Sequence, residues 1–374
     1  MKVLSIIGTR PEAIKMAPVI KALESYAPKI QSLVCATGQH RKMLDQVLSL
    51  FNISPDIDLD LMRPNQDLHS LTGKVFVEVG KVLEEIKPDV VLVQGDTTTV
   101  MAASIAAYYH RIPVGHVEAG LRTSTLYSPF PEEGNRRLTS VVTTFHFAPT
   151  ALAKKALLQE GVEEEKIFLT GNTVIDALFF ILKQPVPEQA GALLDIARIN
   201  GNPSDRRLVL VTAHRRENFG ERLKSICRGL RMLVERNSDV VLIYPVHLNP
   251  NVYDTVHRML DGVERIMLTD PVTYDVLAHL MCAAHLVLTD SGGIQEEAPS
   301  LGKPVLVMRT ETERPEGIQA GTAKLVGPDG ARIVAETEIL LQNADEYNKM
   351  AKAINPYGDG RTAKRIVDIL INHF

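Results

Sequence analysis

Short apolar runs that alternate with helical patterns are the feature that most constrains the fold of this chain. The runs are rich in β-branched residues and are apolar at consecutive positions, as in Val90–Val93 and Leu208–Val211. Strands that are buried on both faces show this pattern, because helices cover both sides of a parallel sheet. The sequence therefore predicts an α/β protein built from Rossmann-like, doubly wound parallel sheets.

The expected elements fall into two series within 374 residues, a length that suits about two domains. We expect strands at Val3–Ile7, Ser32–Ala36, Val90–Val93, Val114–Val117, Thr144–Ala148 and Ile167–Thr170, and then at Leu208–Thr212, Val240–Tyr244, Ile266–Leu268, Leu286–Thr289 and Val305–Met308. We expect helices at Glu12–Tyr26, Thr97–Tyr109, Ala151–Gln159, Val174–Leu182, Glu221–Glu235, Gly292–Leu301 and Thr362–Ile371. The segment 184–206 is rich in proline and glycine and interrupts the alternation. We place an N-terminal domain at residues 1–175 and a C-terminal domain at 176–359.

Charge and cysteine content narrow the class of function. The net charge of −4 argues against a general nucleic-acid or membrane-surface binder, so an anionic substrate would need a local cationic pocket. Cys35, Cys227 and Cys282 form no CxxC pair, which favours reduced thiols over a zinc or redox site. No apolar stretch approaches the ~20 residues of a membrane span, and the first apolar run is too short for a signal peptide. We expect a cytoplasmic protein.

The first strand is followed by Gly8-Thr9-Arg10-Pro11-Glu12, with Lys15 one turn into the next helix. Backbone amides at a helix start, together with Arg10 and Lys15, favour an anion site. An ordinary surface turn with exposed charges is the alternative. The turn has no GxGxxG pattern, so the sequence gives no sign of a nicotinamide cofactor.

Three acidic sites follow strands of the first series or the loop after them: Asp96, Glu118 and the pair Glu132-Glu133. Because the carboxyl ends of parallel strands share one edge of the sheet, these carboxylates are expected to converge and to suit acid/base chemistry. Two alternatives stay open. Asp96 can cap the helix that follows it, and the acids can be paired with arginines, for which the nearby choices are Arg122, Arg136 and Arg137.

Cationic and glycine-rich turns mark the second series. His214, Arg215 and Arg216 follow its first strand, where successive cations suit a diphosphate. Ser291, Gly292 and Gly293 begin a helix, where glycines let a phosphate approach the backbone. One turn later Glu297 can accept hydrogen bonds from a ribose diol, and Arg314 offers another cation; the alternative for Arg314 is a structural ion pair.

Two further patterns have simpler interpretations. Asp56-Ile57-Asp58-Leu59-Asp60 resembles a metal-binding DxD, but its alternation fits a solvated strand face better, so no metal is expected. Gly302-Lys303 lacks the upstream glycine spacing of a P-loop, which argues against a kinase or ATPase.

Taken together, these stretches resemble the non-hydrolysing UDP-N-acetylglucosamine 2-epimerases. The resemblance extends nearly from end to end, in the same order along the chain. It rests on GTRPEAIKMAP (8–18), TGQHRKMLDQVL (37–48), GDTTTV (95–100), GHVEAGLRT (115–123), YSPFPEEGNR (127–136), TAHRREN (212–218), YPVHLNP (244–250), TDSGGIQEEAPSLGKPVL (289–306), ERPEGI (313–318) and NPYGDGR (355–361).

The resemblance implies a fold, a site and a set of partners. It implies the two-domain GT-B fold with the site in the cleft between the domains, and a last helix, 360–374, that packs back on the N-terminal domain. It implies a catalytic set of Asp96, Glu118, Glu132 and His214, and substrate contacts from Arg10, Lys15, Asp96, Glu118, His214, Ser291, Gly292, Gly293, Glu297 and Arg314. The expected partner is UDP-N-acetylglucosamine, with no cofactor, and the expected assembly is a homodimer.

The resemblance also implies a second, activating substrate site. Gln39, Arg215 and His247 match its residues, whereas Lys42 and Asn65 stand where such members commonly have glutamine and arginine. This departure puts allosteric activation in doubt.

The expected reaction is reversible inversion at C2 of UDP-N-acetylglucosamine, by elimination and re-addition of UDP, in the synthesis of bacterial surface polysaccharide precursors. The C2 proton is not next to a carbonyl, so its removal must accompany loss of UDP, which requires a base, an acid and a cationic clamp. The residues do not tell which carboxylate is the acid. The alternatives are a UDP-sugar glycosyltransferase on the same fold, a hydrolysing epimerase and a non-catalytic nucleotide-sugar sensor.

Overall fold

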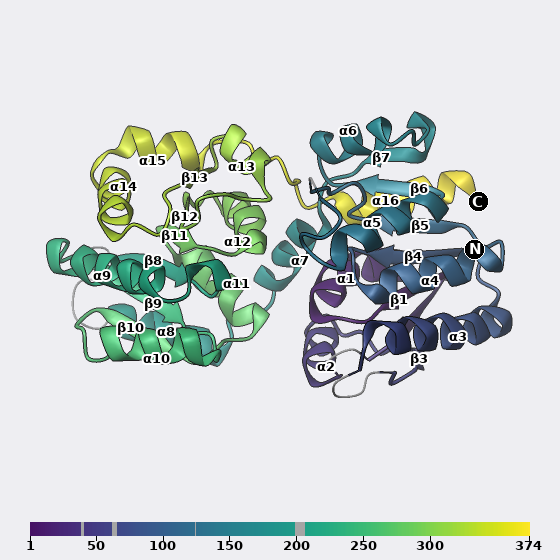
Figure 1. Ribbon diagram of the computed structural model, residues 1–374, viewed down its shortest axis with the longest axis horizontal. Helices are drawn as coiled ribbons and strands as arrows, with labels where there is room; N and C mark the ends of the chain where they lie inside the picture. Colours follow the sequence, from purple (N-terminus) through teal and green to yellow (C-terminus); the bar gives the residue numbers. More distant parts are fainter. Residues whose placement is uncertain (39–40, 62–65, 124, 199–205) are drawn as a thin grey trace. The chain divides into compact units, whose positions relative to one another are not determined.

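The computed structural model describes residues 1–38, 41–61, 66–123, 125–198 and 206–374. The chain forms two compact units (Figure 1). The N-terminal unit comprises Met1–Phe180 together with Tyr357–Phe374, and the C-terminal unit comprises Ile181–Pro356. The chain therefore crosses twice between the units, once at the end of the first series of elements and once before the last helix.

The N-terminal unit is built on a seven-stranded sheet in the order β3-β2-β1-β4-β5-β6-β7, in which every neighbouring pair is parallel. The strands are β1 (Lys2–Ile7), β2 (Gln31–Ala36), β3 (Ile57–Asp58), β4 (Val90–Gln94), β5 (Val114–Val117), β6 (Phe145–Ala148) and β7 (Ile167–Leu169). The strand order reverses direction between β1 and β4. This confirms the predicted doubly wound sheet and places a topological switch point, the usual ligand position, at the ends of β1 and β4.

Helices cover both faces of this sheet. They are α1 (Arg10–Glu24), α2 (Arg41–Leu50), α3 (Leu68–Ile86), α4 (Thr98–Tyr109), α5 (Glu132–Val142), α6 (Ala151–Gln159), α7 (Thr173–Leu182) and α16 (Thr362–His373), with a 3₁₀ turn at Glu164–Lys166. Helices α3, α4 and α5 lie side by side, as do α2, α1 and α16. Leu71, Val75 and Val79 of α3 recur every four residues and are buried against Val91 and Val93 of β4.

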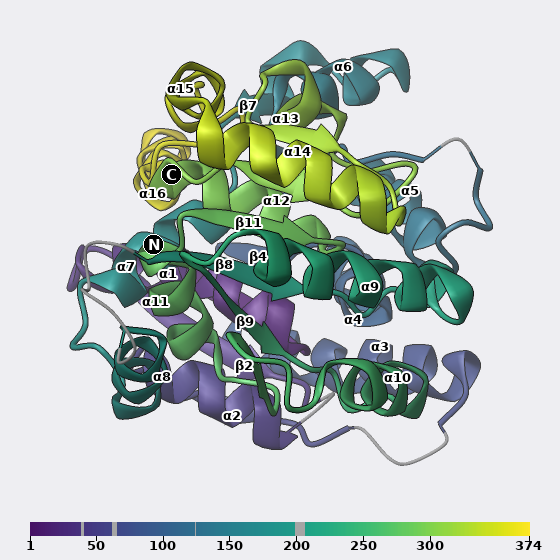
Figure 2. The same cartoon turned by 90° about the vertical axis from the view of Figure 1, so that its left-hand side faces the viewer.

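The C-terminal unit repeats the architecture with a six-stranded parallel sheet in the order β10-β9-β8-β11-β12-β13. Its strands are β8 (Arg207–Thr212), β9 (Val240–Pro245), β10 (Ile266–Thr269), β11 (Leu286–Thr289), β12 (Val305–Val307) and β13 (Ala323–Leu325). Its helices are α8 (Glu188–Arg198), α9 (Glu221–Arg236), α10 (Pro250–Leu260), α11 (Tyr274–Ala283), α12 (Gly292–Glu297), α13 (Pro315–Gln319), α14 (Gly330–Gln342) and α15 (Ala344–Ala351), with 3₁₀ turns at Arg216–Asn218 and Ala298–Leu301. Figure 2 shows α14, α9 and α10 side by side over the sheet.

The structure contains elements that the prediction did not name: the helices α2, α3, α5, α10, α11, α13, α14 and α15, and also α8 and the strand β13. Glu188–Arg198 forms α8 inside the segment that the prolines and glycines marked as irregular, because the prolines stand before and after the helix and Gly191 is tolerated within it. Ala323–Leu325 forms β13, which the prediction missed because three residues with Lys324 at the centre give no apolar run. Ile57–Asp58, expected as a solvated strand face, forms the short edge strand β3.

The last helix belongs to the N-terminal unit and is fixed there by a buried acid (Figure 1, yellow). Asp176 of α7 accepts hydrogen bonds from the backbone amides of Thr362 at 3.2 Å and Ala363 at 2.9 Å. These amides belong to the first turn of α16, whose own N-cap side chain makes no capping bond. At the C-terminal end of α16, Phe145 of β6 packs edge-on against His373.

No helix among the described residues is both long and apolar enough to cross a membrane.

Replacing Asp176 tests this attachment. Asp176→Ala removes the acceptor for two first-turn amides, and we expect α16 to lose about 1–2 kcal/mol of local stability. Amide hydrogen exchange measured across residues 362–373 should quicken accordingly, while Asp176→Asn, which keeps an acceptor oxygen, should change it less. Exposed Asp254 on α10 supplies the matched control, Asp254→Asn. Unchanged exchange in α16 of Asp176→Ala would show that this cap is dispensable.

Candidate active site

In the N-terminal unit, the predicted functional side chains come from turns at the carboxyl ends of β1, β4 and β5, which are neighbours in the sheet. The turn after β1 starts α1. Thr9 is the N-cap, and Thr9 and Glu12 form a reciprocal capping box with Pro11 in the first turn. Arg10, the first residue of the helix, is half-buried, and its side chain forms no ion pair or hydrogen bond with another described residue.

Glu12 ties this turn to the next one along the sheet edge. One carboxylate oxygen, Oε2, accepts hydrogen bonds from the backbone amides of Gly8 and Thr9, and the other accepts from the Thr97 hydroxyl at 2.6 Å. Glu12 is 2% exposed, and burial raises its pKa to about 7 in spite of these donors. Glu12 thus joins the turns after β1 and β4, and sequence reasoning assigned it no role.

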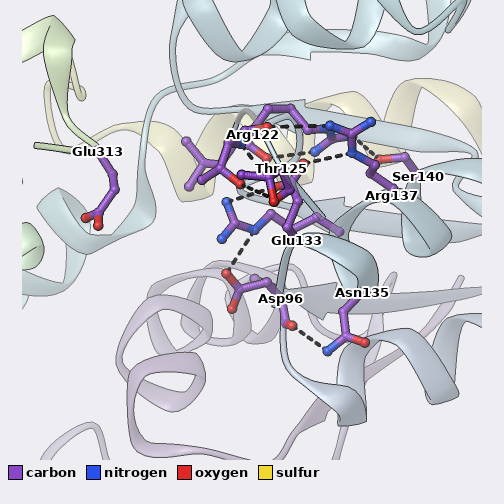
Figure 3. Close-up of polar contacts among 12 residues, drawn as sticks. Asp96, Arg122, Thr125, Glu133, Asn135, Arg137, Ser140 and Glu313 are labelled. Atoms are coloured by element: carbon purple, nitrogen blue, oxygen red, sulfur yellow. Dashed lines mark hydrogen bonds and ion pairs between the residues drawn. The ribbon is translucent and has the colours of Figure 1, made fainter. Parts of the chain in front are cut away.

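Asp96 is held through its backbone as well as its side chain. The ring Nε2 of His116 bonds the Gly95 carbonyl at 2.7 Å, and the Asn135 amide donates to the Asp96 carbonyl at 2.9 Å (Figure 3). The Asp96 carboxylate forms an ion pair with Arg136, with 3.1 Å between Oδ2 and Nε. Burial raises the pKa of Asp96, and the Arg136 charge opposes that rise. The carboxyl group of Asp96 therefore favours its uncharged form more than that of an exposed aspartate does.

Two alternatives for Asp96 are now decided. Thr97 caps α4 by accepting from the Val100 amide, so the capping interpretation of Asp96 was wrong. The arginine pairing was right, with Arg136 as the partner.

Glu118 is the most enclosed of the predicted catalytic acids, at 7% exposed. The Lys15 ammonium lies 2.6 and 2.7 Å from its two carboxylate oxygens, and the Gln94 and Asn172 amides also donate to it, the latter at 3.2 Å. These donors come from α1, β4 and the turn after β7. Its backbone is left-handed, with φ of +66°, a conformation that costs energy in a non-glycine residue and is typical of functional positions.

The acidic pair that opens α5 divides into two roles. Glu133 is fully buried, forms ion pairs with Arg136 and Arg137 and accepts from the Thr123 amide, which makes it a structural acid (Figure 3). The Oε2 atom of Glu132 is buried and accepts no hydrogen bond from another described residue. Such an atom is costly unless a substrate group supplies its partner, which favours Glu132 as the functional member.

Sequence reasoning missed the residues that position these acids: Gln94, His116, Asn135 and Asn172. Each is at most 5% exposed. A polar residue within an apolar strand was the available signal for Gln94 and His116, whereas Asn135 in α5 and Asn172 in the turn after β7 gave none. Burial lowers the pKa of His116 to about 4, so its ring is neutral and acts through hydrogen bonding rather than charge.

In the C-terminal unit, Asp290 organises the turn after β8. This carboxylate is fully buried and accepts from the His214 amide at 2.9 Å, the Arg215 amide at 2.8 Å and the Asn218 side chain at 3.0 Å. β8 and β11 flank the point where the strand order reverses in this sheet, so Asp290 lies at its topological switch point.

The His214 side chain is aligned by its neighbours. Its ring lies nearly parallel to that of His247, with centroids 5.5 Å apart, and its Nδ1 is 3.6 Å from Asp290 Oδ1. Burial lowers the pKa of His214; Asp290 opposes this, whereas His247 and Arg215 add to it. Burial thus favours the neutral imidazole, so Arg215 and Arg216 are the permanent cations of this turn.

The turn after β11 carries the remaining predicted contacts. Ser291 occupies the N-cap position of α12 but makes no side-chain capping bond, and Gly292 and Gly293 begin the helix. Glu297, 6% exposed, accepts from the Tyr274 hydroxyl at 2.7 Å. Arg314 forms an ion pair with buried Glu296, in line with the structural alternative for this arginine.

The proposed activating site is only partly described. Gln39 and Asn65 lie outside the described residues, and Lys42 lies in α2. Arg215 is 4.0 Å from Glu313, and His247 is exposed.

Among the described residues no group of three metal-ligating side chains comes together. Asp56, the first acid of the DxD-like pattern, accepts a hydrogen bond from the backbone amide of Val34.

This geometry can support proton transfer and anion binding. Two predicted acids, Asp96 and Glu118, stand at adjacent strand ends of one sheet, and a third, Glu132, begins the helix whose Arg136 pairs with Asp96. Their surroundings differ: Asp96 has a raised pKa, Glu118 is paired with Lys15, and Glu132 has an unsatisfied oxygen. Acids made unequal by their environment are the usual basis of acid/base catalysis.

Comparison with known proteins agrees with this chemistry. Residues 21–371 match the family model described as UDP-N-acetylglucosamine 2-epimerase. The UDP-N-acetylglucosamine 2-epimerase of Salmonella typhimurium strain LT2 is 53% identical over 373 residues, covering 99% of this chain and 98% of the relative.

Solved structures extend the agreement to three dimensions. The UDP-GlcNAc 2-epimerase of Neisseria meningitidis, in a crystal structure bound to UDP-GlcNAc, is 50% identical, has a TM-score of 0.89 and is matched over the full length of both chains. The enzyme of Methanocaldococcus jannaschii, crystallised with UDP-GlcNAc and UDP, is 36% identical with a TM-score of 0.78, again over both full chains. These likenesses confirm the GT-B fold class. The chain thus belongs to the UDP-N-acetylglucosamine 2-epimerase family.

Proposed function

We propose that this protein inverts C2 of UDP-N-acetylglucosamine to give UDP-N-acetylmannosamine. The observation that carries the proposal is the set of three carboxylates, Asp96, Glu118 and Glu132, held in unequal environments in the N-terminal unit of a chain from this family. Inversion at one carbon needs a proton to leave one face and another to arrive on the opposite face. A group transfer to an acceptor does not need three acids around the sugar.

The reaction proceeds by elimination and re-addition. A carboxylate removes the C2 proton as the C1–oxygen bond to UDP breaks, which leaves a 2-acetamido sugar with a C1–C2 double bond and free UDP. A second acid then protonates C2 from the other face while UDP adds back to C1. No electrons leave the sugar, so the reaction has no need of a redox cofactor.

The three acids are suited to different tasks. Glu118, held by the Lys15 ammonium and two amides, favours the carboxylate form. Burial raises the pKa of Asp96, so this acid stays protonated up to a higher pH than an exposed aspartate does. The Arg136 charge opposes the rise. The buried, unpartnered oxygen of Glu132 is available to a sugar hydroxyl or to the reacting proton. The assignment of acid and base among them stays open.

The leaving diphosphate needs donors and positive charge. We assign this role to Arg10 in the N-terminal unit and to His214, Ser291, Gly292, Gly293 and Arg314 in the C-terminal unit. Arg10 has no ion-pair partner among the described residues, so its charge is available to a phosphate. An approaching anion would also favour protonation of His214, whose pKa burial depresses.

Three further properties belong to the proposal. The expected assembly is a homodimer, the expected compartment is the cytoplasm, and the expected pathway is the supply of precursors for bacterial surface polysaccharide. A glycosyltransferase and a hydrolysing epimerase are the alternatives in activity. Incubation with UDP-N-acetylglucosamine alone separates them, because a transferase without acceptor leaves it intact and a hydrolysing enzyme releases UDP.

Turnover in deuterated water tests the elimination step. We expect deuterium at C2 of the product, because the second acid, which protonates C2 from the other face, carries a proton that has exchanged with solvent. Proton NMR of the sugar, which also identifies the mannosamine epimer, provides the measurement. Epimerised product with protium retained at C2 would exclude this mechanism.

Substitution of Glu118 tests its role in proton transfer. Glu118→Gln keeps the shape but cannot accept the proton, and its amide nitrogen cannot accept from the donors that one carboxylate oxygen serves, so we expect kcat to fall at least ~100-fold. Glu133→Gln is the matched control, because Glu133 is buried in ion pairs on α5 and should affect stability more than the chemical step. Near-normal turnover of Glu118→Gln, with UDP binding intact, would make Glu118 structural.

The departures at Lys42 and Asn65 give a kinetic prediction. If they abolish activation, an assay started from UDP-N-acetylmannosamine should begin without a lag, and added UDP-N-acetylglucosamine should not accelerate it. A lag that UDP-N-acetylglucosamine removes would show that the activating site is retained.

A further inference from the structure

The carboxylate of Glu297 is fixed by a phenol from a neighbouring helix. Tyr274 is the first residue of α11, and its hydroxyl donates to Glu297 Oε2 at 2.7 Å. Both side chains are 6% exposed, so the contact lies inside the C-terminal unit. A hydrogen bond between a neutral donor and a buried carboxylate is stronger than one between neutral groups and restricts how the acceptor can rotate.

The orientation of Glu297 places its second oxygen beside the glycines that begin α12. A Cβ built on Gly293 would lie 3.5 Å from Glu297 Oε1, so this oxygen borders the backbone that we assign to the diphosphate. The hydroxyl of Tyr274 thus sets which carboxylate oxygen faces that backbone. A phenylalanine would fill the same space in the core without this constraint.

The neighbouring acid has a different partner. Glu296 forms an ion pair with Arg314, whereas Glu297 accepts from the tyrosine hydroxyl. The contacts of these two adjacent buried acids thus include a cation at Glu296 and a phenol at Glu297. A simple need to neutralise charge would not explain the hydroxyl, because it brings no positive charge.

We propose that Tyr274 is a positioning residue that makes the site select ribose over deoxyribose, acting through Glu297. The inference rests on the proposed function, in which UDP is the nucleotide and Glu297 accepts from the ribose diol. A carboxylate whose plane is fixed can accept from a 2′-hydroxyl at a set position. A site built to bond a hydroxyl discriminates strongly against the analogue that lacks it, because a buried polar group then loses its partner.

The competing explanation is that the hydroxyl only ties α11 to the end of α12. In that case its removal would lower stability and weaken both nucleotides alike. The ratio of affinities for the ribose and 2′-deoxyribose forms separates the explanations, since a structural role does not change that ratio.

The experiment measures the dissociation constants of UDP and 2′-deoxy-UDP by calorimetry, together with kcat and KM for UDP-N-acetylglucosamine. We expect the unmodified protein to prefer UDP by at least ~100-fold and Tyr274→Phe to lower this preference at least ~10-fold, mainly through weaker UDP binding. KM should rise while kcat stays within about twofold. Tyr253→Phe, at a half-buried tyrosine on α10 of the same unit, is the control and should leave the preference unchanged.

The outcomes are decisive in either direction. An unchanged preference in Tyr274→Phe, or no preference in the unmodified protein, would overturn the proposal. If Tyr274→Phe does not fold, Glu297→Gln tests the same link and should also lose the preference. Because nucleotide binding is measured without turnover, absence of epimerisation would refute the proposed function while leaving the ribose preference measurable.

Discussion

The buried ion pair between Lys15 and Glu118 is the interaction on which the acidic edge of the N-terminal unit depends. It joins residues 103 positions apart in sequence, from the first helix and from the turn after β5. The pair forms because parallel strands bring their following turns to one edge of the sheet. Glu118 adopts a left-handed backbone conformation in this turn, and the lysine offsets the cost of burying the Glu118 charge. Without this pairing the Glu118 carboxylate, which is only 7% exposed, would favour its neutral form.

Both units solve the same structural problem in the same way. In each sheet the turn after the first strand carries functional groups, and a buried acid accepts hydrogen bonds from its backbone amides. Glu12 does so for Gly8 and Thr9, and Asp290 does so for His214 and Arg215. Glu12 also accepts from a residue of the turn after β4, and Asp290 follows β11, whereas the amides that it binds follow β8. Each acid therefore fixes its turn relative to the rest of the sheet edge. The functional side chains therefore stand on rigid turns.

The extent to which sequence predicted this molecule follows from physical causes. The long central strands were predictable because burial on both faces requires continuous apolar residues, as in Val90–Val93. β13 and α8 were not, because Lys324 interrupts one and the surrounding prolines and Gly191 obscure the other. The acids Asp96 and Glu118 were found from their places after strands, whereas Glu132 was singled out from the pair Glu132-Glu133 by the family resemblance. Their partners were not, because Gln94, Asn135 and Asn172 meet them only through the tertiary arrangement of turns, which no local pattern records.

A crystal structure of this protein with UDP-N-acetylglucosamine bound is the most direct test of the central claim. The account predicts that C2 of the sugar lies within about 3–3.5 Å of a carboxylate oxygen of Asp96, Glu118 or Glu132, the near-attack distance for proton transfer. It also predicts that the diphosphate of the same molecule is contacted by His214. A sugar nucleotide bound elsewhere, with Glu118 still closed on Lys15 and no acid near C2, would contradict it.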